Sequence, residues 1–117
     1  MITFELFKKL MAFKTKNSLC IEIFFKVKGN EKFDCCWMGK LYDKNVSADV
    51  FWFGLTPDGK NGYDYTRFED FLSAKVFDDK SLVEIWDDIT ISEINGCDPM
   101  VMVEMYLYGS GGLMSPQ

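Results

Sequence analysis

The sequence predicts an α+β fold, with a mainly antiparallel sheet of about five strands, an N-terminal helix and two short helices between the third and fourth strands. Short apolar runs alternate with polar residues, which is typical of half-buried strands. Predicted strands and helices also follow one another in separate groups, which favours an antiparallel sheet with helices on one face. The chain has 117 residues, of which 48% are hydrophobic, so it can form one core and is not expected to be disordered.

We expect one domain over residues 1–108 and a flexible tail over 109–117. The tail reads GSGGLMSPQ, which is rich in Gly, Ser and Pro and lacks apolar periodicity. The first helix is predicted over residues 3–13, with Thr3 as its candidate N-cap. Its apolar residues recur at helical spacing and are Leu6, Phe7, Leu10 and Met11. The opposite side of this helix is polar, so it is expected to pack on the core rather than on a membrane.

The next two runs predict a β-hairpin. Residues 19–28 alternate between apolar and polar side chains, and a second alternating run covers residues 33–41. Opposed residues of an antiparallel pair share a face, so the loop length decides which residues are buried. A three-residue loop, Gly29–Glu31, gives the apolar pairs Val27 with Phe33, Phe25 with Cys35 and Ile23 with Trp37. This register predicts Cys35 in the core and Cys36 on the other face.

The apolar run over residues 48–55 predicts a strand in the middle of the fold. It reads ADVFWFGL and is apolar on both sides of the alternation, which is typical of a central strand covered on both faces. We therefore expect this strand to be the most buried. Turn-forming residues follow over 56–62, and residues 63–65 are predicted to return as a short strand.

Two capping boxes predict two short helices. Thr66 with Glu69, and Ser81 with Glu84, each stand before apolar residues at helical spacing. The remaining predicted elements are a strand over 89–94, a turn over 95–99 and a final strand over 100–108.

The absence of histidine excludes several chemistries. It removes every Ser–His and Cys–His nucleophile pair and the usual ligands of catalytic zinc. The cysteines form no CxxC pair and are expected to be reduced, buried and without a metal; they are Cys20, Cys35, Cys36 and Cys97. The phosphate-binding and nucleophile motifs GxGxxG, GxxxxGK[ST] and GxSxG are absent as well. We therefore expect no cofactor, and the sequence favours a protein that is not an enzyme.

Composition also excludes two classes of partner. No run approaches the roughly 18 apolar residues of a membrane span. Lys8 and Lys9 follow the first apolar residues instead of preceding them, unlike a secretory signal, so we expect a cytoplasmic protein. A net charge of -5 opposes the phosphate backbone, so we expect no binding to nucleic acid.

Several acidic residues stand in patterns that resemble metal-binding or catalytic sites. The loop 58–64 fails the calcium-loop spacing, because Pro57 and Gly59 would stand at ligand positions. Paired carboxylates can catalyse hydrolysis together with a metal ion. Adjacent residues seldom face each other, however, so we expect the carboxylate pairs of this chain to be exposed to solvent on the surface. The pairs are Glu69-Asp70, Asp78-Asp79 and Asp87-Asp88.

Charge is unevenly distributed and supports the leading hypothesis. Residues 1–44 carry nine basic and five acidic residues, a net +4, whereas residues 45–117 carry four and thirteen, a net -9. We expect a non-catalytic protein-binding module, such as an inhibitor, adaptor or immunity-type partner, whose acidic part meets a basic protein. The alternative is a small-ligand domain or an enzyme that uses carboxylate and tyrosine residues in a pocket between sheet and helices. The candidate interaction surface consists of Asp58, Tyr63, Asp64, Tyr65, Asp87 and Asp88.

Overall fold

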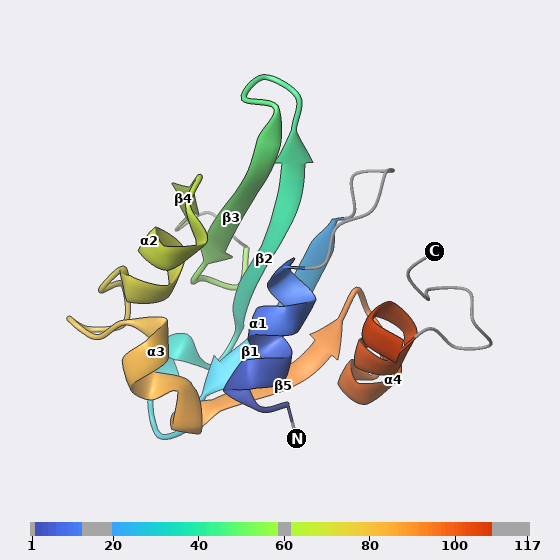
Figure 1. Ribbon diagram of the computed structural model, residues 1–117. Helices are drawn as coiled ribbons and strands as arrows, with labels where there is room; N and C mark the ends of the chain where they lie inside the picture. The colour runs from blue at the N-terminus through green and yellow to red at the C-terminus, as the bar shows by residue number, and fades with distance from the viewer. Residues whose placement is uncertain (1, 13–19, 59–61, 109–117) are drawn as a thin grey trace.

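The computed structural model describes residues 2–12, 20–58 and 62–108, and its five strands form one antiparallel sheet in the order β4-β3-β2-β1-β5 (Figure 1). The strands are β1 (Ile21–Val27), β2 (Cys36–Asp43), β3 (Ala48–Gly54), β4 (Gly62–Tyr65) and β5 (Ile89–Ile94). The α-helices are α1 (Phe4–Ala12), α2 (Phe68–Ser73), α3 (Leu82–Ile85) and α4 (Pro99–Val103). Short helical turns are η1 (Glu31–Phe33), η2 (Trp86–Asp88) and η3 (Glu104–Tyr108). The predicted fold class is confirmed, except that α2 and α3 lie between β4 and β5 and not between the third and fourth strands; the predicted tail lies outside the described residues.

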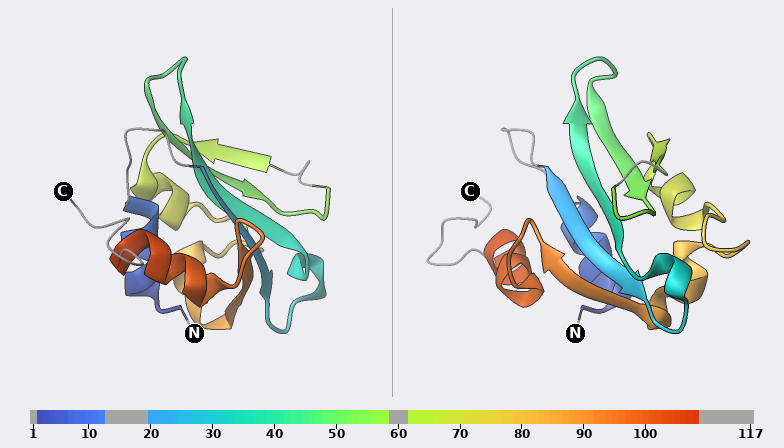
Figure 2. Two further views of the ribbon diagram at one scale, coloured as in Figure 1. Left: turned by 90° about the vertical axis from the view of Figure 1, so that its right-hand side faces the viewer. Right: turned by 180° about the vertical axis from the view of Figure 1, so that it is seen from behind.

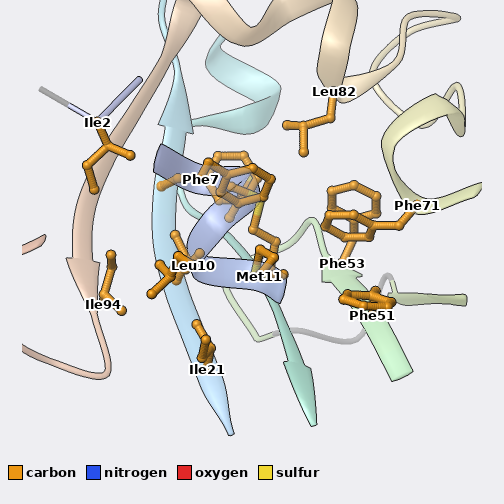
Figure 3. Close-up of a cluster of buried hydrophobic side chains, with 14 of the residues drawn as sticks. Ile2, Phe7, Leu10, Met11, Ile21, Phe51, Phe53, Phe71, Leu82 and Ile94 are labelled. Carbon is orange, nitrogen blue, oxygen red and sulfur yellow. The ribbon is translucent and has the colours of Figure 1, made fainter. Parts of the chain in front are cut away.

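The helices lie on one face of the sheet. In Figure 1, α1 crosses in front of the strands, and from behind the strands lie in front of α1 (Figure 2). Helix α1 begins as predicted, because the backbone N–H of Leu6 donates to the Thr3 hydroxyl at 3.1 Å. Its apolar side is buried against the sheet through Phe7, Leu10 and Met11 (Figure 3). One layer of helices therefore covers one face.

Aromatic rings fill the space between the sheet and the helices. Phe53 of β3 stacks on Phe71 of α2 with ring centroids 4.2 Å apart (Figure 3). Phe77, in the chain between α2 and α3, packs edge-on against Phe53 at 5.4 Å. Phe7 of α1 lies 4.7 Å from Trp86. Such ring pairs add specific geometry to the burial of apolar area, so they fix where α1 and α2 sit on the sheet.

The predicted register of the first hairpin is wrong by one residue. In the structure Phe25 pairs with Cys36 and Phe24 with Trp37. The cause is η1: the Asn30 side chain accepts a hydrogen bond from Lys32 N–H at 3.1 Å, and this turn takes up more of the chain than a three-residue loop would. A shift of one residue moves every β2 side chain to the other face. Cys36 is therefore buried in the core, where Cys35 was expected.

The C-terminal segment is helical, whereas a strand was predicted over residues 100–108. Asp98 caps α4 by accepting from the backbone N–H groups of Met100 and Val101, and Pro99 occupies the first turn. Proline there needs no N–H donor and has the backbone angle of a helix. The segment buries Met102, Val103 and Tyr106, which is a helical and not a strand spacing.

One of the two predicted capping boxes forms. Ser81 accepts from Glu84 N–H at 3.2 Å, and the Glu84 carboxylate accepts from Ser81 N–H at 2.9 Å. Helix α2 instead has Arg67 as its N-cap, with no side-chain capping bond, so the box predicted at Thr66 is wrong.

Strand β3 has no exposed residue, but its two faces are not covered equally, contrary to the prediction. Its alternate residues Phe51 and Phe53 are buried under the helices, but Val50 and Trp52 on its other side are only partly buried. The run ADVFWFGL was read as covered on both faces. Among the described residues, no helix covers the second face, so half of these apolar side chains remain accessible to solvent.

Candidate functional site: the open face of the sheet

We call the side of the sheet away from the helices the open face. Strand pairing places one row of residues across it: Glu22 of β1, Gly39 of β2, Trp52 of β3 and Asp64 of β4. The next row consists of Phe24, Trp37, Gly54 and Gly62. The register of β2 is what brings the Trp37 side chain to this face. Apolar and acidic side chains therefore share one uncovered surface.

Three aromatic residues form a cluster on the open face that is separate from the core. Phe24 and Trp37 have ring centroids 4.8 Å apart with a tilt of 41°. The Trp52 ring lies so close to Gly39 that a Cβ added to that glycine would stand 3.0 Å from Trp52 Cζ2. The indole Nε1 of Trp52 is buried and has no hydrogen-bond partner among the described residues. All three rings remain partly accessible to solvent.

A hollow of about 360 Å³ lies between the two tryptophans. Its lining residues are Glu22, Trp37, Trp52, Pro57 and Asp58. Pro57 and Asp58 come from the loop that follows β3, so this loop turns back beside the open face. The Thr56 hydroxyl donates to Asp58 Oδ1 at 2.6 Å, which fixes the orientation of that carboxylate. Two indoles and two carboxylates thus surround one small space, which we call the Trp37–Trp52 hollow.

The structure divides the predicted interaction surface. Asp58 lines the Trp37–Trp52 hollow, and Asp64 stands opposite Trp52 on the open face. Tyr63 and Tyr65 point to the helix side, where they pair with Phe53 and Phe51 of β3.

Tyr63 and Tyr65 differ in exposure. Tyr63 is exposed, as predicted, but Tyr65 packs on Phe53 and Phe71 at 6.2 and 6.3 Å. Burial, followed by the neighbouring Tyr63 and Asp64, raises the pKa of Tyr65. Tyr65 therefore belongs to the edge of the core.

The last two predicted residues, Asp87 and Asp88, lie elsewhere. They form η2, just before β5, at the opposite edge of the sheet from β4. Both are exposed, and the Asp88 carbonyl accepts from Lys28 N–H at 2.7 Å. The structure does not bring them together with Asp58 and Asp64, so the predicted six residues do not form one surface.

The interaction surface predicted from the sequence did not include Glu22, Phe24, Trp37 or Trp52. Trp37 was assigned to the core by the wrong register, and Trp52 was assigned to a strand covered on both sides. Alternation does place Phe24 on the polar side of β1, because it stands between Glu22 and Lys26, but it does not mark Phe24 as part of an interaction site. For Trp52 no such signal exists, because both sides of its strand are apolar.

One member of two of the predicted carboxylate pairs is engaged in an ion pair with a basic residue. Glu69 lies 3.3 Å from Arg67, and Asp78 lies 2.5 Å from Lys32. Hydrogen bonds from Lys32 and Asn30 lower the pKa of Asp78. These contacts hold the loops around η1 and Asp78 together and give no pair of facing acids.

We predict that Cys36 resists alkylation in the folded protein. It is fully buried, its thiol donates to the Leu55 carbonyl at 3.6 Å, and burial raises its pKa to about 11. At pH 8 its thiolate fraction is then at least about 100-fold below that of an ordinary thiol. Folding raises the pKa of Cys36, so the folded state favours the protonated thiol. The contribution of this thiol to stability is fully present below the pKa of the free thiol and is lost as the pH rises towards 11.

Timed alkylation with iodoacetamide and peptide mass spectrometry measures this difference, with exposed Cys97 as the internal control. Equal labelling rates at Cys36 and Cys97 under native conditions would show the prediction to be wrong.

Three further findings concern metals, membranes and similarity. Within the described part of the chain, no group of three or more Cys, Asp or Glu side chains is placed to hold a metal ion. None of the helices over residues 2–12, 20–58 and 62–108 has the length and apolar character needed to cross a membrane. No protein-family model, curated protein or solved structure matches the chain.

Proposed function

We propose that the chain is a non-catalytic protein-binding domain that docks a basic protein on the open face. The observation that carries the proposal is the aromatic cluster of Phe24, Trp37 and Trp52 on an uncovered sheet surface. Contiguous apolar surface outside the core often marks an interaction site. Tryptophan is also enriched among the residues that dominate binding energy at interfaces.

Charge supports a basic partner. Acidic side chains surround the cluster, namely Glu22, Asp58, Asp64 and Glu93, whereas Lys26 is the basic residue that the strand pairing places on this face among the described residues. The net charge of -5 acts in the same direction. Complementary charge speeds the encounter and selects against acidic partners, while the aromatic cluster provides burial.

The alternative, a ligand pocket or active site between sheet and helices, has less support. The centre of that layer is filled by rings such as Phe53 and Phe71. A hollow of about 290 Å³ lies at its margin beside Phe51, and its one carboxylate, Asp49, is paired with Lys40. Within the described part of the chain no second acid lines this hollow, so the two carboxylates of a histidine-free hydrolase are not brought together there.

A matched pair of charge substitutions tests the proposal. Leu41→Lys places a positive charge on the open face, at a residue that is 41% exposed. Val83→Lys places the same charge on α3, at a residue that is 47% exposed. Binding partners captured by the wild type from the native host are identified and purified, and their affinities are measured by calorimetry at several salt concentrations.

A basic partner whose affinity falls with rising salt, and falls at least tenfold with Leu41→Lys but little with Val83→Lys, supports the proposal. The proposal fails if no partner is found at any ionic strength, or if Val83→Lys weakens binding and Leu41→Lys does not.

A further inference from the structure

We infer that the Trp37–Trp52 hollow binds one arginine side chain of the partner. This inference rests on the proposed function and deepens it, because it names the group that the open face recognises. With a volume of about 360 Å³, the hollow accepts a single long side chain but not a helix or a strand.

The walls of the hollow favour a cation. Trp37 and Trp52 both line it, and the face of an indole carries negative electrostatic potential that attracts a cation within about 6 Å. Glu22 and Asp58 add two negative charges to the same small space. Among the residues that the structure describes, no basic side chain lines the hollow, and its two carboxylates repel an anion.

The Glu22 side chain is available for such a cation. Among the described residues its carboxylate makes no ion pair and no hydrogen bond, although its backbone is held on both sides. Its N–H donates to Asn95 Oδ1 at 2.7 Å, and its carbonyl accepts from Asn95 N–H at 2.7 Å. The backbone that carries the Glu22 side chain is therefore held in place, and its carboxylate is unpaired within the described part of the chain.

The backbone beneath the hollow keeps it open. Gly39 stands between Glu22 and Trp52, and Gly54 stands opposite Trp37, so two positions facing the space carry no side chain. Trp52 rests on Gly39, and Trp37 packs on Phe24. Because these rings are held by their neighbours, a ligand does not have to order them, which lowers the entropic cost of binding.

Arginine fits this chemistry better than lysine. A guanidinium is planar, so it stacks on an indole while its edge donates two hydrogen bonds to a carboxylate. It is also more weakly hydrated than an ammonium and loses less on entering a space walled by rings. Lysine would gain the charge attraction but not the stacking or the paired hydrogen bonds.

The test uses three blocked tripeptides, Gly-Arg-Gly, Gly-Lys-Gly and Gly-citrulline-Gly, titrated into the full chain. Citrulline has the shape of arginine without the charge. Binding is followed by the NMR signals of the indole N–H groups, with Trp86, which lies on the helix side against Phe7, as the internal reference.

We expect saturable shifts of the Trp37 and Trp52 signals, an affinity for the arginine peptide at least fivefold above that for the lysine peptide, and no saturation with citrulline. Glu22→Gln should weaken arginine binding at least fivefold. Glu93→Gln, which removes an exposed carboxylate beside Phe24 but outside the hollow, should leave it unchanged.

The arginine assignment is overturned if the Trp37 and Trp52 signals do not respond, if citrulline binds as well as arginine, or if both Gln variants weaken binding equally. If such a result is obtained while a basic protein partner still binds and is weakened by Leu41→Lys, only the arginine assignment is wrong and the proposed function stands. Arginine binding without any protein partner would instead remove the proposed function.

Discussion

Gly39→Ala is expected to destabilise the protein by about 3 to 5 kcal/mol, because the new methyl group would collide with the backbone of the neighbouring strand. A Cβ at Gly39 would stand 1.9 Å from the carbonyl oxygen of Ile21 and 2.9 Å from its carbonyl carbon. Neither atom can move without separating β1 from β2, which are paired along this stretch. The same methyl group would press on Trp52, so the Trp37–Trp52 hollow would change shape as well.

Gly96→Ala is the matched control for this substitution. Gly96 has a φ of +76°, and a Cβ there would meet nothing within 4 Å. Only the left-handed backbone is strained, at a cost of about 1 to 2 kcal/mol. Urea unfolding followed by circular dichroism gives both free energies of unfolding. Equal losses for the two variants would show that the close approach of β1 and β2 at Gly39 does not restrict the residue there.

The alternation of apolar residues predicted β1 and β2 but not which way β2 faces. Phe25 pairs with Cys36 because η1 occupies the chain between β1 and β2. This turn is held by a side-chain hydrogen bond from Lys32 N–H to Asn30 and by a backbone hydrogen bond from Phe33 N–H to the Asn30 carbonyl. Counting residues in a loop cannot reveal such a turn, and an error of one residue exchanges core for surface along the whole strand.

The C-terminal helix could have been predicted from residues that were present in the sequence. Asp98 followed by Pro99 is an N-cap and first-turn signature, and it stands directly before the apolar run. The run itself fits both periods, because Val101 and Val103 alternate while Met102 and Tyr106 are four apart. The capping signal decides between the two interpretations when periodicity does not.

The open face could not be predicted from the sequence, because its exposure depends on tertiary structure. Trp52 and Phe53 are adjacent in an apolar strand, and the sequence makes them equivalent. Helices cover Phe53, whereas no described helix covers Trp52. A strand that is apolar on both sides therefore indicates either a second covering layer within the chain or a surface for a partner.

The register of β2 places a lysine, Lys40, in the core, and its removal or the removal of its partner is expected to change stability. Lys40 faces the helices, is 1% exposed and lies 3.6 Å from the carboxylate of Asp49. Removing one partner of a buried pair leaves a charge with less compensation and costs about 3 kcal/mol or more, whereas replacing the cation by an apolar residue of similar shape is often neutral. We therefore expect Asp49→Ala to lower the free energy of unfolding by about 3 kcal/mol, and Lys40→Met to change it by less than about 1 kcal/mol.

The double variant Lys40→Met/Asp49→Ala separates the charge effect from lost packing. When Lys40 is replaced by Met, the loss of Asp49 no longer leaves a buried positive charge without its partner. The double variant should therefore be more stable than Asp49→Ala alone by about 2 kcal/mol. Urea unfolding of the four proteins at pH 7 gives the coupling between the two residues. If Lys40→Met costs more than Asp49→Ala, the interactions of the ammonium group contribute more to stability than its burial costs. The lysine would then stabilise the sheet beneath α1 instead of depending on Asp49 for its tolerance in the core.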